Sequence, residues 1–457
     1  MQEQYVDTNF REEDLEELKG LFRDRQFADL KVKLATLNEA DVAAAFEEMP
    51  SDVIPVIFRL LGKEEAAEVF ARLEPDKREV LINALTDKEL GLVLDELFLD
   101  DTVDLVEEMP ANVVARILRN TDQATRNQIN ELLKYPEDSA GAMMTVEYIN
   151  IKKNMTVKEA IDRIRSKAPD SETIYTVYVT DDRKLIGVCT IKELLLAKDD
   201  ELIENIMETN VITVNTLEDK EDVAKMFNKY DFLALPVVDT EARLVGIVTV
   251  DDAIDVLQEE NTEDITKMAA IADASETYFK TSVFKHAKNR IVWLLVLMLS
   301  STLTGIIITK YENAFAVVPL LVSFIPMLMD TGGNCGSQAS TLIIRGIALD
   351  EIVFKDVFKV IFKEFRVSII VGAILSVVNG LRIYIFYHDM QIAIVVAVSL
   401  ILTIMLAKFI GGVLPLVAKK LNLDPALMAA PLITTVVDTC SILVYFKTAT
   451  IFFGIHV

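Results

Sequence analysis

Nineteen consecutive uncharged residues lie between Arg290 and Lys310, with the sequence IVWLLVLMLSSTLTGIIIT. At about 1.5 Å of rise per residue, a helix of this length spans about 28 Å, close to the hydrocarbon thickness of a bilayer. We therefore predict a membrane-spanning helix here, within an all-α polytopic membrane domain over residues 285–457. Four further spans are predicted at about 315–344, 366–387, 391–418 and 428–450.

Charge is divided along the chain at the start of these spans. Residues 1–284 contain 62 acidic and 32 basic residues, a net charge of −30, whereas residues 285–457 contain 9 acidic and 14 basic residues, a net charge of +5. Basic residues gather before the first span, between the second and third, and between the fourth and fifth. This bias predicts a cytoplasmic N-terminus and, with five spans, an external C-terminus. The chain opens without the basic start and short apolar core of a cleaved signal peptide.

Three cysteines and three histidines are scattered through the chain, with no CxxC pair. We expect no disulfide framework and no zinc, nickel or copper site built on thiolates or imidazoles. The sequence also has no P-loop, no GxGxxG motif and no cluster of nucleophile, base and orienting acid. We therefore predict that the protein is not an enzyme.

The second predicted span contains the polar stretch MLMDTGGNCGSQAST at 327–341. Its glycines are expected to kink the helix and expose carbonyls that need water, protein or an ion, with close helix packing as the alternative. The fifth span carries a lone carboxylate, Asp438, with no base in the same apolar run. Such an acid marks an ion pathway by default, a protonated structural acid being the alternative. Oxygen ligands of these kinds suit Mg²⁺, Ca²⁺ or Mn²⁺.

An internal repeat occupies residues 144–257. YTVYVTDDRKLIGVCTIKELL at 175–195 matches ALPVVDTEARLVGIVTVDDAI at 234–254, and the G-h-h-T-x-x-[DE] ending recurs 59 residues further on. Two such small β-α-β units are expected to pair face to face. The repeat resembles a tandem pair of cystathionine-β-synthase (CBS) modules, which implies an α/β domain over residues 136–257.

The cleft between CBS modules often holds an adenine nucleotide, although many pairs bind nothing. By this resemblance, the candidates for nucleotide binding are Tyr175, Glu193, Phe232, Thr249 and Asp252.

Residues 1–135 read as short helices with breaks at EEMP (47–50 and 107–110) and RLEP (72–75). Amphipathic runs follow each break, which predicts an acidic, all-α superhelical N domain. Its acids include Glu96 and Asp100, which we expect one helical turn apart. A merely solvated acidic face is the alternative.

A connecting helix is predicted within residues 251–284. A stripe of like charge on one helical face costs stability in isolation, and a divalent cation that bridges it to another acidic surface would remove that cost. The segment is therefore either a metal-sensing connector or an ordinary solvated helix. The acidic face holds Asp252, Asp255, Glu259 and Glu263, and the apolar face holds Val250, Ile254, Leu257 and Ile265.

Taken in order, these parts resemble the MgtE-type magnesium channels over nearly the whole chain. The motifs that carry the resemblance are TGGNCGSQAST at 331–341, LNLDPALMAAPLITTVVDT at 421–439 and YPEDSAG at 135–141. The resemblance implies a homodimer in the lipid of the plasma membrane (the inner membrane of a bacterium), with a pore between subunits and no nucleic-acid partner. The implied pore ligands for hydrated Mg²⁺ are Asp438, Gly333, Asn334, Ser337 and Thr341.

Two positions depart from the family's pattern in this segment. Members commonly have an amide where this chain has Ser337, and often glycine where it has Asp330. Asp330 therefore adds a charge at the implied pore, and its effect on selectivity is open.

The resemblance also implies closure of the pore by intracellular Mg²⁺, while binding of ATP to the CBS pair stays open. Bound ions would bridge the N domain, the CBS pair and the connecting helix. Independently, a net charge of −30 must repel itself, and bound cations would favour the compact arrangement. The matched positions are Glu64, Glu96, Asp100, Gly141, Glu221, Asp231, Asp252, Asp255, Glu260, Glu263, Asp264 and Asp424.

Two rival functions fit the same residues. One is a transporter of another divalent ion, Mn²⁺ or Co²⁺, which competition uptake would separate from Mg²⁺. The other is a membrane-anchored adenine-nucleotide sensor without transport. The sensor predicts that Asp438→Asn leaves the phenotype intact, whereas a channel predicts lost or altered flux.

Overall fold

The computed structural model describes residues 12–272, 278–279, 281–312, 317–428 and 430–454. The chain divides into two compact units, Met1–Leu257 and Gln258–Val457, which are considered separately below. Small parts of the predicted N domain (1–11), connecting segment (273–277 and 280), second span (315–316) and fifth span (429) lie outside the described residues.

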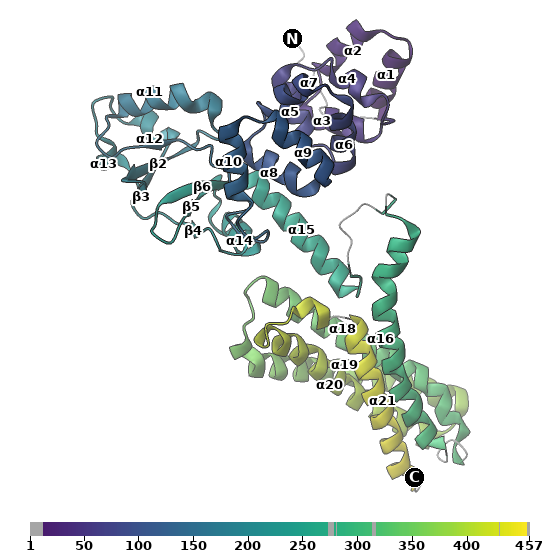
Figure 1. Ribbon diagram of the computed structural model, residues 1–457. Helices are drawn as coiled ribbons and strands as arrows, with labels where there is room; N and C mark the ends of the chain where they lie inside the picture. Colours follow the sequence, from purple (N-terminus) through teal and green to yellow (C-terminus); the bar gives the residue numbers. More distant parts are fainter. Residues whose placement is uncertain (1–11, 273–277, 280, 313–316, 429, 455–457) are drawn as a thin grey trace, which may run out of the picture. The chain divides into compact units, whose positions relative to one another are not determined.

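Short helices make up the N-terminal part of the first unit, as predicted (Figure 1). Proline sets several of their ends, because its fixed φ suits a first turn and its missing N–H does not suit an interior. Pro75 opens α6, and Pro110 is the N-cap of α9. The helices are α1 (Glu12–Arg23), α2 (Phe27–Leu34), α3 (Glu39–Glu47), α4 (Ile54–Phe58), α5 (Lys63–Ala71), α6 (Pro75–Ala84), α7 (Asp87–Leu94), α8 (Leu99–Glu108), α9 (Ala111–Asn120) and α10 (Gln123–Leu132).

The expected spacing of Glu96 and Asp100 on one helix is wrong. Glu96 lies in the connection between α7 and α8, whereas Asp100 lies in the first turn of α8. The helix is interrupted here because the N–H of Leu99 donates to Oε2 of Glu147 at 2.9 Å, so a distant carboxylate caps a new helix.

Two copies of one small α/β unit follow, which confirms the predicted repeat. In each copy the first strand is parallel to the second, and the second is antiparallel to the third. The first copy has β1 (Asn150–Ile151), α11 (Val157–Lys167), η1 (Ala168–Asp170), β2 (Thr176–Asp181), β3 (Lys184–Thr190) and α12 (Ile191–Leu196). The second has α13 (Ile203–Ile206), β4 (Val214–Asn215), α14 (Lys220–Tyr230), β5 (Ala234–Val238), β6 (Leu244–Thr249) and the start of α15 (Val250–Met268).

Apolar packing joins the two copies to each other and to the helical part. Tyr178 of the first copy is fully buried in a cluster with Ala234, Leu244 and Ile247 of the second. A larger continuous core runs from the N-terminal helices into the second copy, where it includes Val237. Burial of this kind stabilises the unit by about 25 cal/mol per Å² of apolar surface removed from water.

Helix α15 forms where the connecting helix was predicted, but the predicted apolar face is partly wrong. Ile254 and Ile265 are 49% and 68% exposed, whereas Ala253 and Val256 are buried. The prediction assumed that one face of α15 is buried along the whole helix. Only its first turns pack into the core of the first unit, which decides the buried face there.

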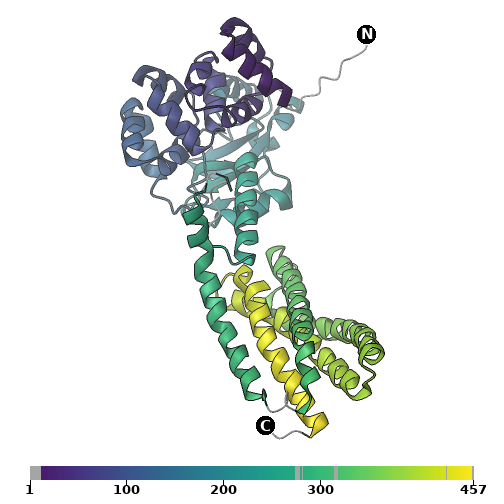
Figure 2. The same ribbon diagram turned by 90° about the vertical axis from the view of Figure 1, so that its right-hand side faces the viewer.

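Long helices make up the second unit (Figure 2). Four of them, within 283–310, 354–387, 390–420 and 425–453, are long and apolar enough to cross a membrane. The polar stretch lies on α18, which is not among these four, so its crossing stays a prediction. The elements are α16 (Val283–Lys310), η2 (Pro319–Phe324), α18 (Ile325–Ala348), η3 (Phe354–Asp356), α19 (Val357–Tyr387), α20 (Met390–Lys420), η4 (Pro425–Met428) and α21 (Ala430–Phe453).

Candidate functional site

Polar side chains form one face of α18. Asp330, Asn334, Ser337 and Thr341 recur every three or four residues and therefore share a side of the helix. Asp330, Asn334 and Thr341 are exposed, and Oγ of Ser337 is buried without a hydrogen-bond partner in the described part of the chain. A polar stripe of this kind is unfavourable against lipid, so water, an ion or another chain has to cover it.

Asp438 lies on α21, where this helix packs against the glycines of α18. A Cβ added to Gly333 would lie 3.7 Å from Oδ1 of Asp438 and 3.1 Å from Cγ2 of Thr434. Gly333 therefore faces the carboxylate directly. The structure thus brings the lone acid of the predicted fifth span to the polar segment of the second.

α18 is helical without interruption from Ile325 to Ala348, so the glycine segment does not break the helix. The expected kink, a bend of the helix axis, stays a prediction. The glycines permit close helix packing, which was the alternative interpretation. A Cβ on Gly336 would approach Cγ2 of Ile433 to 2.8 Å, and a Cβ on Gly411 of α20 would collide with the carbonyl oxygen of Gly336.

A second group of acids lies within the first unit, between α8 and the CBS pair. One carboxylate oxygen from each of Asp100, Glu147 and Glu172 lies within 4.8 Å of the others. Glu147 is held by the N–H of Leu99, and Oε2 of Glu172 is buried with no hydrogen-bond partner among the described residues. Asp252, at the start of α15, accepts a hydrogen bond from Oγ1 of Thr249 at 2.5 Å.

The electrostatics of this acidic group are strained. Burial, followed by repulsion from Asp252 and other acids, raises the pKa of Asp100 well above its usual value. Burial, followed by repulsion from Asp101, Asp251 and Asp252, raises the pKa of Glu172 to about 8. Burial also raises the pKa of Asp252 to about 6. These shifts mean that a proton or a cation is needed to relieve the group.

Of the acids in this group, sequence reasoning identified Asp100 and Asp252 but missed Glu147 and Glu172. Neither of the missed residues belongs to a helical stripe or a repeat position, because both lie outside helices and strands. No spacing in the sequence links them to Asp100. The three acids come together only because α8 packs on the CBS pair.

The remaining predicted regulatory residues of the first unit lie in other places. Glu64 is exposed in the first turn of α5, and Lys63 beside it forms an ion pair with Glu96. Glu221 is paired with Lys225 on α14 at 2.7 Å. Asp231 is the C-cap of α14, with φ of 55°.

Gly141 has a structural reason to be glycine. Its N–H donates to the carbonyl of Thr216 at 2.9 Å, and a Cβ at this position would meet Cγ of Tyr135 at 2.5 Å. The YPEDSAG segment is therefore packed too closely against the second CBS module for a side chain at this position.

In the second unit, a lysine joins two of the predicted regulatory acids. Nζ of Lys267 lies 2.5 Å from Oε1 of Glu263 and 2.8 Å from Oδ2 of Asp424. Asp424 also caps η4, because its Oδ1 accepts the N–H of Ala426 at 2.8 Å. The predicted residues Asp255, Glu260 and Asp264 lie on α15, with Asp255 exposed and the other two partly buried.

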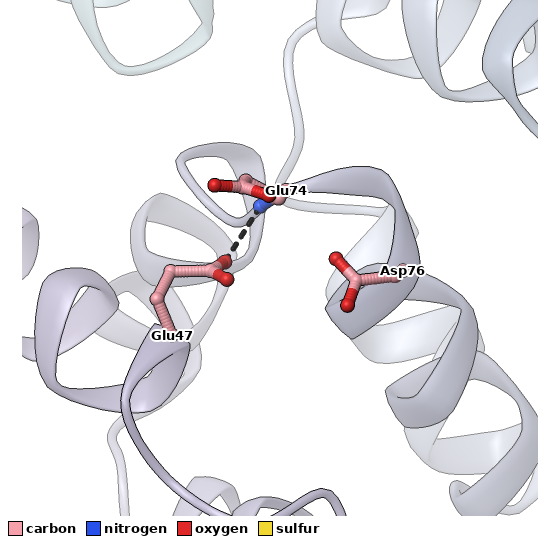
Figure 3. Close-up of side chains that lie close together, drawn as sticks. All are labelled: Glu47, Glu74 and Asp76. Carbon is pink, nitrogen blue, oxygen red and sulfur yellow. Dashed lines mark hydrogen bonds between the residues drawn. The ribbon is translucent and has the colours of Figure 1, made fainter. Parts of the chain in front are cut away.

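Another carboxylate cluster lies in the N-terminal helices (Figure 3). Glu47, Glu74 and Asp76 each place an oxygen within 4.8 Å of the others. Oε1 of Glu47 accepts the N–H of Glu74 at 2.8 Å, at the N-cap of α6. This contact gives Glu47 a structural role in joining α3 to α6.

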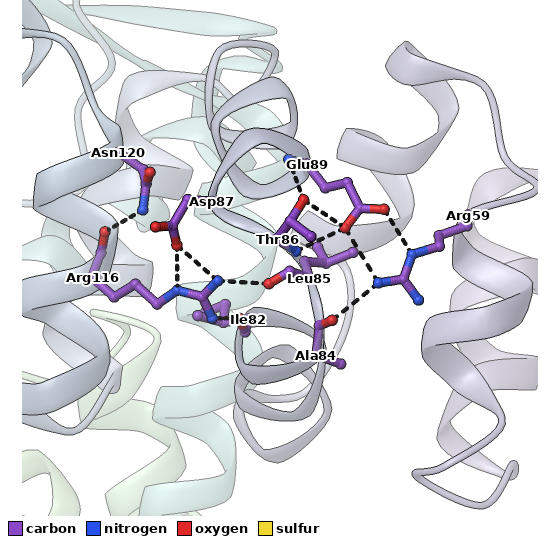
Figure 4. A network of polar contacts seen from close by, with 9 residues as sticks. All are labelled: Arg59, Ile82, Ala84, Leu85, Thr86, Asp87, Glu89, Arg116 and Asn120. Carbon is purple, nitrogen blue, oxygen red and sulfur yellow. Dashed lines mark hydrogen bonds and ion pairs between the residues drawn. The ribbon is translucent and has the colours of Figure 1, made fainter.

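Two arginines tie the N-terminal helices together (Figure 4). Arg59 binds Glu89 of α7 and the carbonyl of Ala84, and Arg116 binds Asp87 of α7. Arg116 also donates to carbonyls at the end of α6, including that of Leu85 at 2.6 Å. These guanidinium groups satisfy carbonyls that a helix end leaves without partners.

A pocket of about 510 Å³ lies between the two CBS modules. Its walls include Tyr175 and Phe232 as well as Lys192 and Asp231. Glu193, Thr249 and Asp252, which were also predicted to bind nucleotide, are not among its lining residues. Glu193 closes a capping box with Thr190, and Thr249 and Asp252 lie at the acidic group described above.

The fold and these sites define a membrane protein with a CBS pair and a polar helix rich in oxygen-bearing side chains. The family model described as "Divalent cation transporter" matches residues 325–448. The model described as "MgtE intracellular N domain" matches residues 37–138, and the CBS domain model matches 140–200 and 203–259.

Relatives are similar over almost the whole length. The chain is 35% identical to the magnesium transporter MgtE of Bacillus subtilis, over 94% of this chain and 96% of that protein. It is 36% identical to the magnesium transporter MgtE of Thermus thermophilus, over 92% and 94%. The chain therefore belongs to the MgtE family.

Solved structures of soluble parts match the first unit. The cytosolic domain of the Mg²⁺ channel MgtE in complex with ATP is 37% identical, with a TM-score of 0.51, over 53% of this chain and 99% of that one. The soluble part of a magnesium transporter is 32% identical, also with a TM-score of 0.51, over 55% and 98%.

Proposed function

We propose that this protein is a magnesium-selective channel of the plasma membrane that intracellular Mg²⁺ closes. The observation that carries the proposal is the exposed polar stripe of α18 beside Asp438. Carboxylate, amide and hydroxyl oxygens there are hard ligands, and Mg²⁺ keeps much of its water, so it needs oxygens that contact a hydrated ion.

The stripe also supports a homodimer. Asp330, Asn334 and Thr341 are exposed within one chain, although the helices around them are apolar. Two copies that turn these faces toward each other would enclose a polar path and shield it from lipid. Asp438, Gly333 and Ser337 would then contribute from each subunit.

Flux through reconstituted protein tests the pore. In proteoliposomes that contain a Mg²⁺-sensitive dye, Asp438→Asn should reduce Mg²⁺ influx at least tenfold or admit other divalent ions. Asp389→Asn is the matched control, because Asp389 only caps α20, and asparagine caps equally well. Influx and selectivity unchanged in Asp438→Asn would contradict the pore role of Asp438. No Mg²⁺ influx through either the parent protein or the variant would support the nucleotide sensor without transport. Competition by Mn²⁺ and Co²⁺ in the same assay would identify a different preferred ion.

The regulatory proposal rests on the acidic group and on Lys267. Asp100, Glu147 and Glu172 meet between α8 and the CBS pair, with repulsion from Asp252, and a divalent ion would relieve this repulsion. In the second unit, the ammonium of Lys267 already bridges Glu263 and Asp424. Cations that hold these acids together would favour one arrangement of the chain over another.

Limited proteolysis of the purified protein tests this regulation. Millimolar Mg²⁺ should protect the linkers at 135–145 and 258–280 from cleavage. Identical digestion patterns with and without the ion would contradict it.

We also propose that the CBS pocket binds ATP. Its aromatic walls suit an adenine ring, Lys192 suits phosphate, and the solved relative described above was crystallised with ATP.

A further inference from the structure

Two oppositely charged side chains are buried between helices of the second unit. Nζ of Lys408 on α20 lies 3.4 Å from Oε2 of Glu364 on α19, and the two residues are 6% and 8% exposed. Neither belongs to the polar stripe of α18. A buried ion pair gives little net stability compared with an apolar pair of similar volume, so its presence calls for a positional explanation.

Between the ion pair and the turn, small residues form the face of α19 that packs on α20. At intervals of four residues after Glu364, the next four residues of α19 are small and buried or nearly so, namely Ser368, Gly372, Ser376 and Gly380. A side-chain hydrogen bond crosses this face, from Oγ of Ser376 to the carbonyl of Ala397 at 2.9 Å. Small residues let helices approach closely but do little to fix where they meet.

A short turn of the chain connects α19 and α20 at one end. Only two residues, His388 and Asp389, separate the end of α19 from the start of α20. The ion pair lies far from this turn, about 20 residues away along each helix, or about 30 Å at 1.5 Å per residue. The turn alone cannot prevent the distant ends from separating. At that end the helices are joined by the ion pair and by an apolar cluster that includes Val360 of α19 and Leu416 of α20. Apolar contacts can slide, whereas an ion pair fixes which residues face each other.

The distant end of α20 supports α18. Gly411, three residues after Lys408, packs against the carbonyl oxygen of Gly336. A Cβ on Gly412 would lie 3.4 Å from Cγ of Glu364. Glu364 therefore contacts the residue of α20 next to Gly411, which packs on Gly336 of α18. Three residues before Gly336 on the same helix, Gly333 faces Asp438.

We propose that Glu364 and Lys408 are positioning residues that clamp the α19–α20 hairpin at the end distant from its turn. The clamp holds α20 in the place where α18 packs on it. Its consequence for ion flux rests on the proposed channel function, whereas the clamp itself does not.

Disulfide cross-linking in the full-length protein tests the clamp. The background has Cys189, Cys335 and Cys440 replaced by alanine. Val360→Cys with Gly412→Cys probes the distant end, because Cγ1 of Val360 lies 3.3 Å from the position of a Cβ on Gly412. Gly380→Cys with Ala397→Cys is the matched control near the turn, with Cβ atoms 3.7 Å apart, which suits a disulfide.

Each cysteine pair is combined with Glu364→Gln/Lys408→Met, which removes both charges and so leaves no unpaired one. We expect the rate of cross-linking at the distant end to fall at least fivefold, while the control pair cross-links as before. The exchanged pair Glu364→Lys/Lys408→Glu should restore cross-linking at the distant end. Equal rates at the distant end with and without the charges would overturn the proposal.

Mg²⁺ influx in the same charge variants separates the clamp from the channel. Influx should fall at least fivefold in the neutral variant and recover in the exchanged one. Influx that stays at the parent's rate in the neutral variant would contradict the positioning role. A parent protein that conducts no divalent ion would overturn the proposed function, while the cross-linking result would still decide the clamp.

Discussion

At the scale of single residues, aromatic side chains distinguish the CBS pocket from the acidic group. Tyr175 and Phe232 line the pocket, whereas Thr249 lies outside it. The sequence predicted all three residues in one nucleotide-binding cleft, because the two modules repeat the same motif. A sequence repeat cannot show which copy of an equivalent residue faces which side of the pair.

This difference gives a prediction for ATP binding. Tyr175→Ala should weaken ATP binding about tenfold, because stacking of a base on an aromatic ring contributes about 1–3 kcal/mol. Thr249→Val is the control and should leave the affinity unchanged. Isothermal titration calorimetry of the purified protein measures the ATP affinity of both variants. A loss of affinity in Thr249→Val alone would place the ATP site on the Thr249 side of the CBS pair instead.

The glycines of the membrane helices give a second prediction. Gly411→Ala should lower the unfolding free energy by about 1–3 kcal/mol, because its methyl group would collide with the backbone of Gly336. Gly305→Ala is the control, since nothing lies within 4 Å of a Cβ there and alanine favours a helix. Thermal unfolding in detergent compares the two. Equal stability of both variants would show that α18 and α20 can move apart without cost.

At the scale of elements, arginine side chains supply hydrogen-bond donors to the last carbonyls of the short N-terminal helices. Each helix there is too short to be stable alone, so packing and end contacts have to hold the stack. Arg116 reaches from α9 to Asp87 of α7 and to the last carbonyls of α6 (Figure 4).

Removal of this contact should loosen three helices together. Arg116→Ala is expected to destabilise them by about 2 kcal/mol, because buried carbonyls lose a charged donor. Hydrogen exchange followed by mass spectrometry should show lost protection in α6, α7 and α9. Arg119→Ala, one helical turn away on an exposed side chain, should leave exchange unchanged. Faster exchange in the control as well would indicate a general effect on α9.

At the scale of the whole molecule, protons and Mg²⁺ should substitute for each other. The folded pKa of Glu172 is about 8 and that of Asp252 about 6, both above the unfolded values of about 4. An acid whose pKa is raised by folding binds protons more tightly in the folded state. The free energy of unfolding is therefore highest at low pH, where both states are protonated. It falls as the pH rises from about 4 toward the folded pKa.

In the presence of EDTA, the first unit should resist proteolysis better at pH 5.5 than at pH 8.5. Mg²⁺ should then protect it more strongly at pH 8.5, where the acids are ionised. Glu172→Gln should reduce this dependence on pH, and Glu131→Gln, an exposed acid on α10, should not. Protection that rises with pH in EDTA would contradict the assignment of these shifts to the folded state.

The amino-acid sequence by itself determined the order of the parts and the residue types available to them. Apolar runs, charge segregation and the internal repeat are local properties. They correspond in the fold to long helices, an acidic N-terminal part and two matching sheets. Asp438 could be recognised from the sequence because a carboxylate within an apolar span is costly whatever the tertiary fold.

Only the tertiary structure decided which distant residues meet. The union of Asp100 with Glu147 and Glu172 depends on α8 packing against the CBS pair, and the Glu364–Lys408 contact depends on the pairing of two helices. The close packing of α18 was also decided there, because α20 and α21 both contact it at its glycines. A spacing pattern describes one element, whereas these contacts are set by the free energy of burying several elements together.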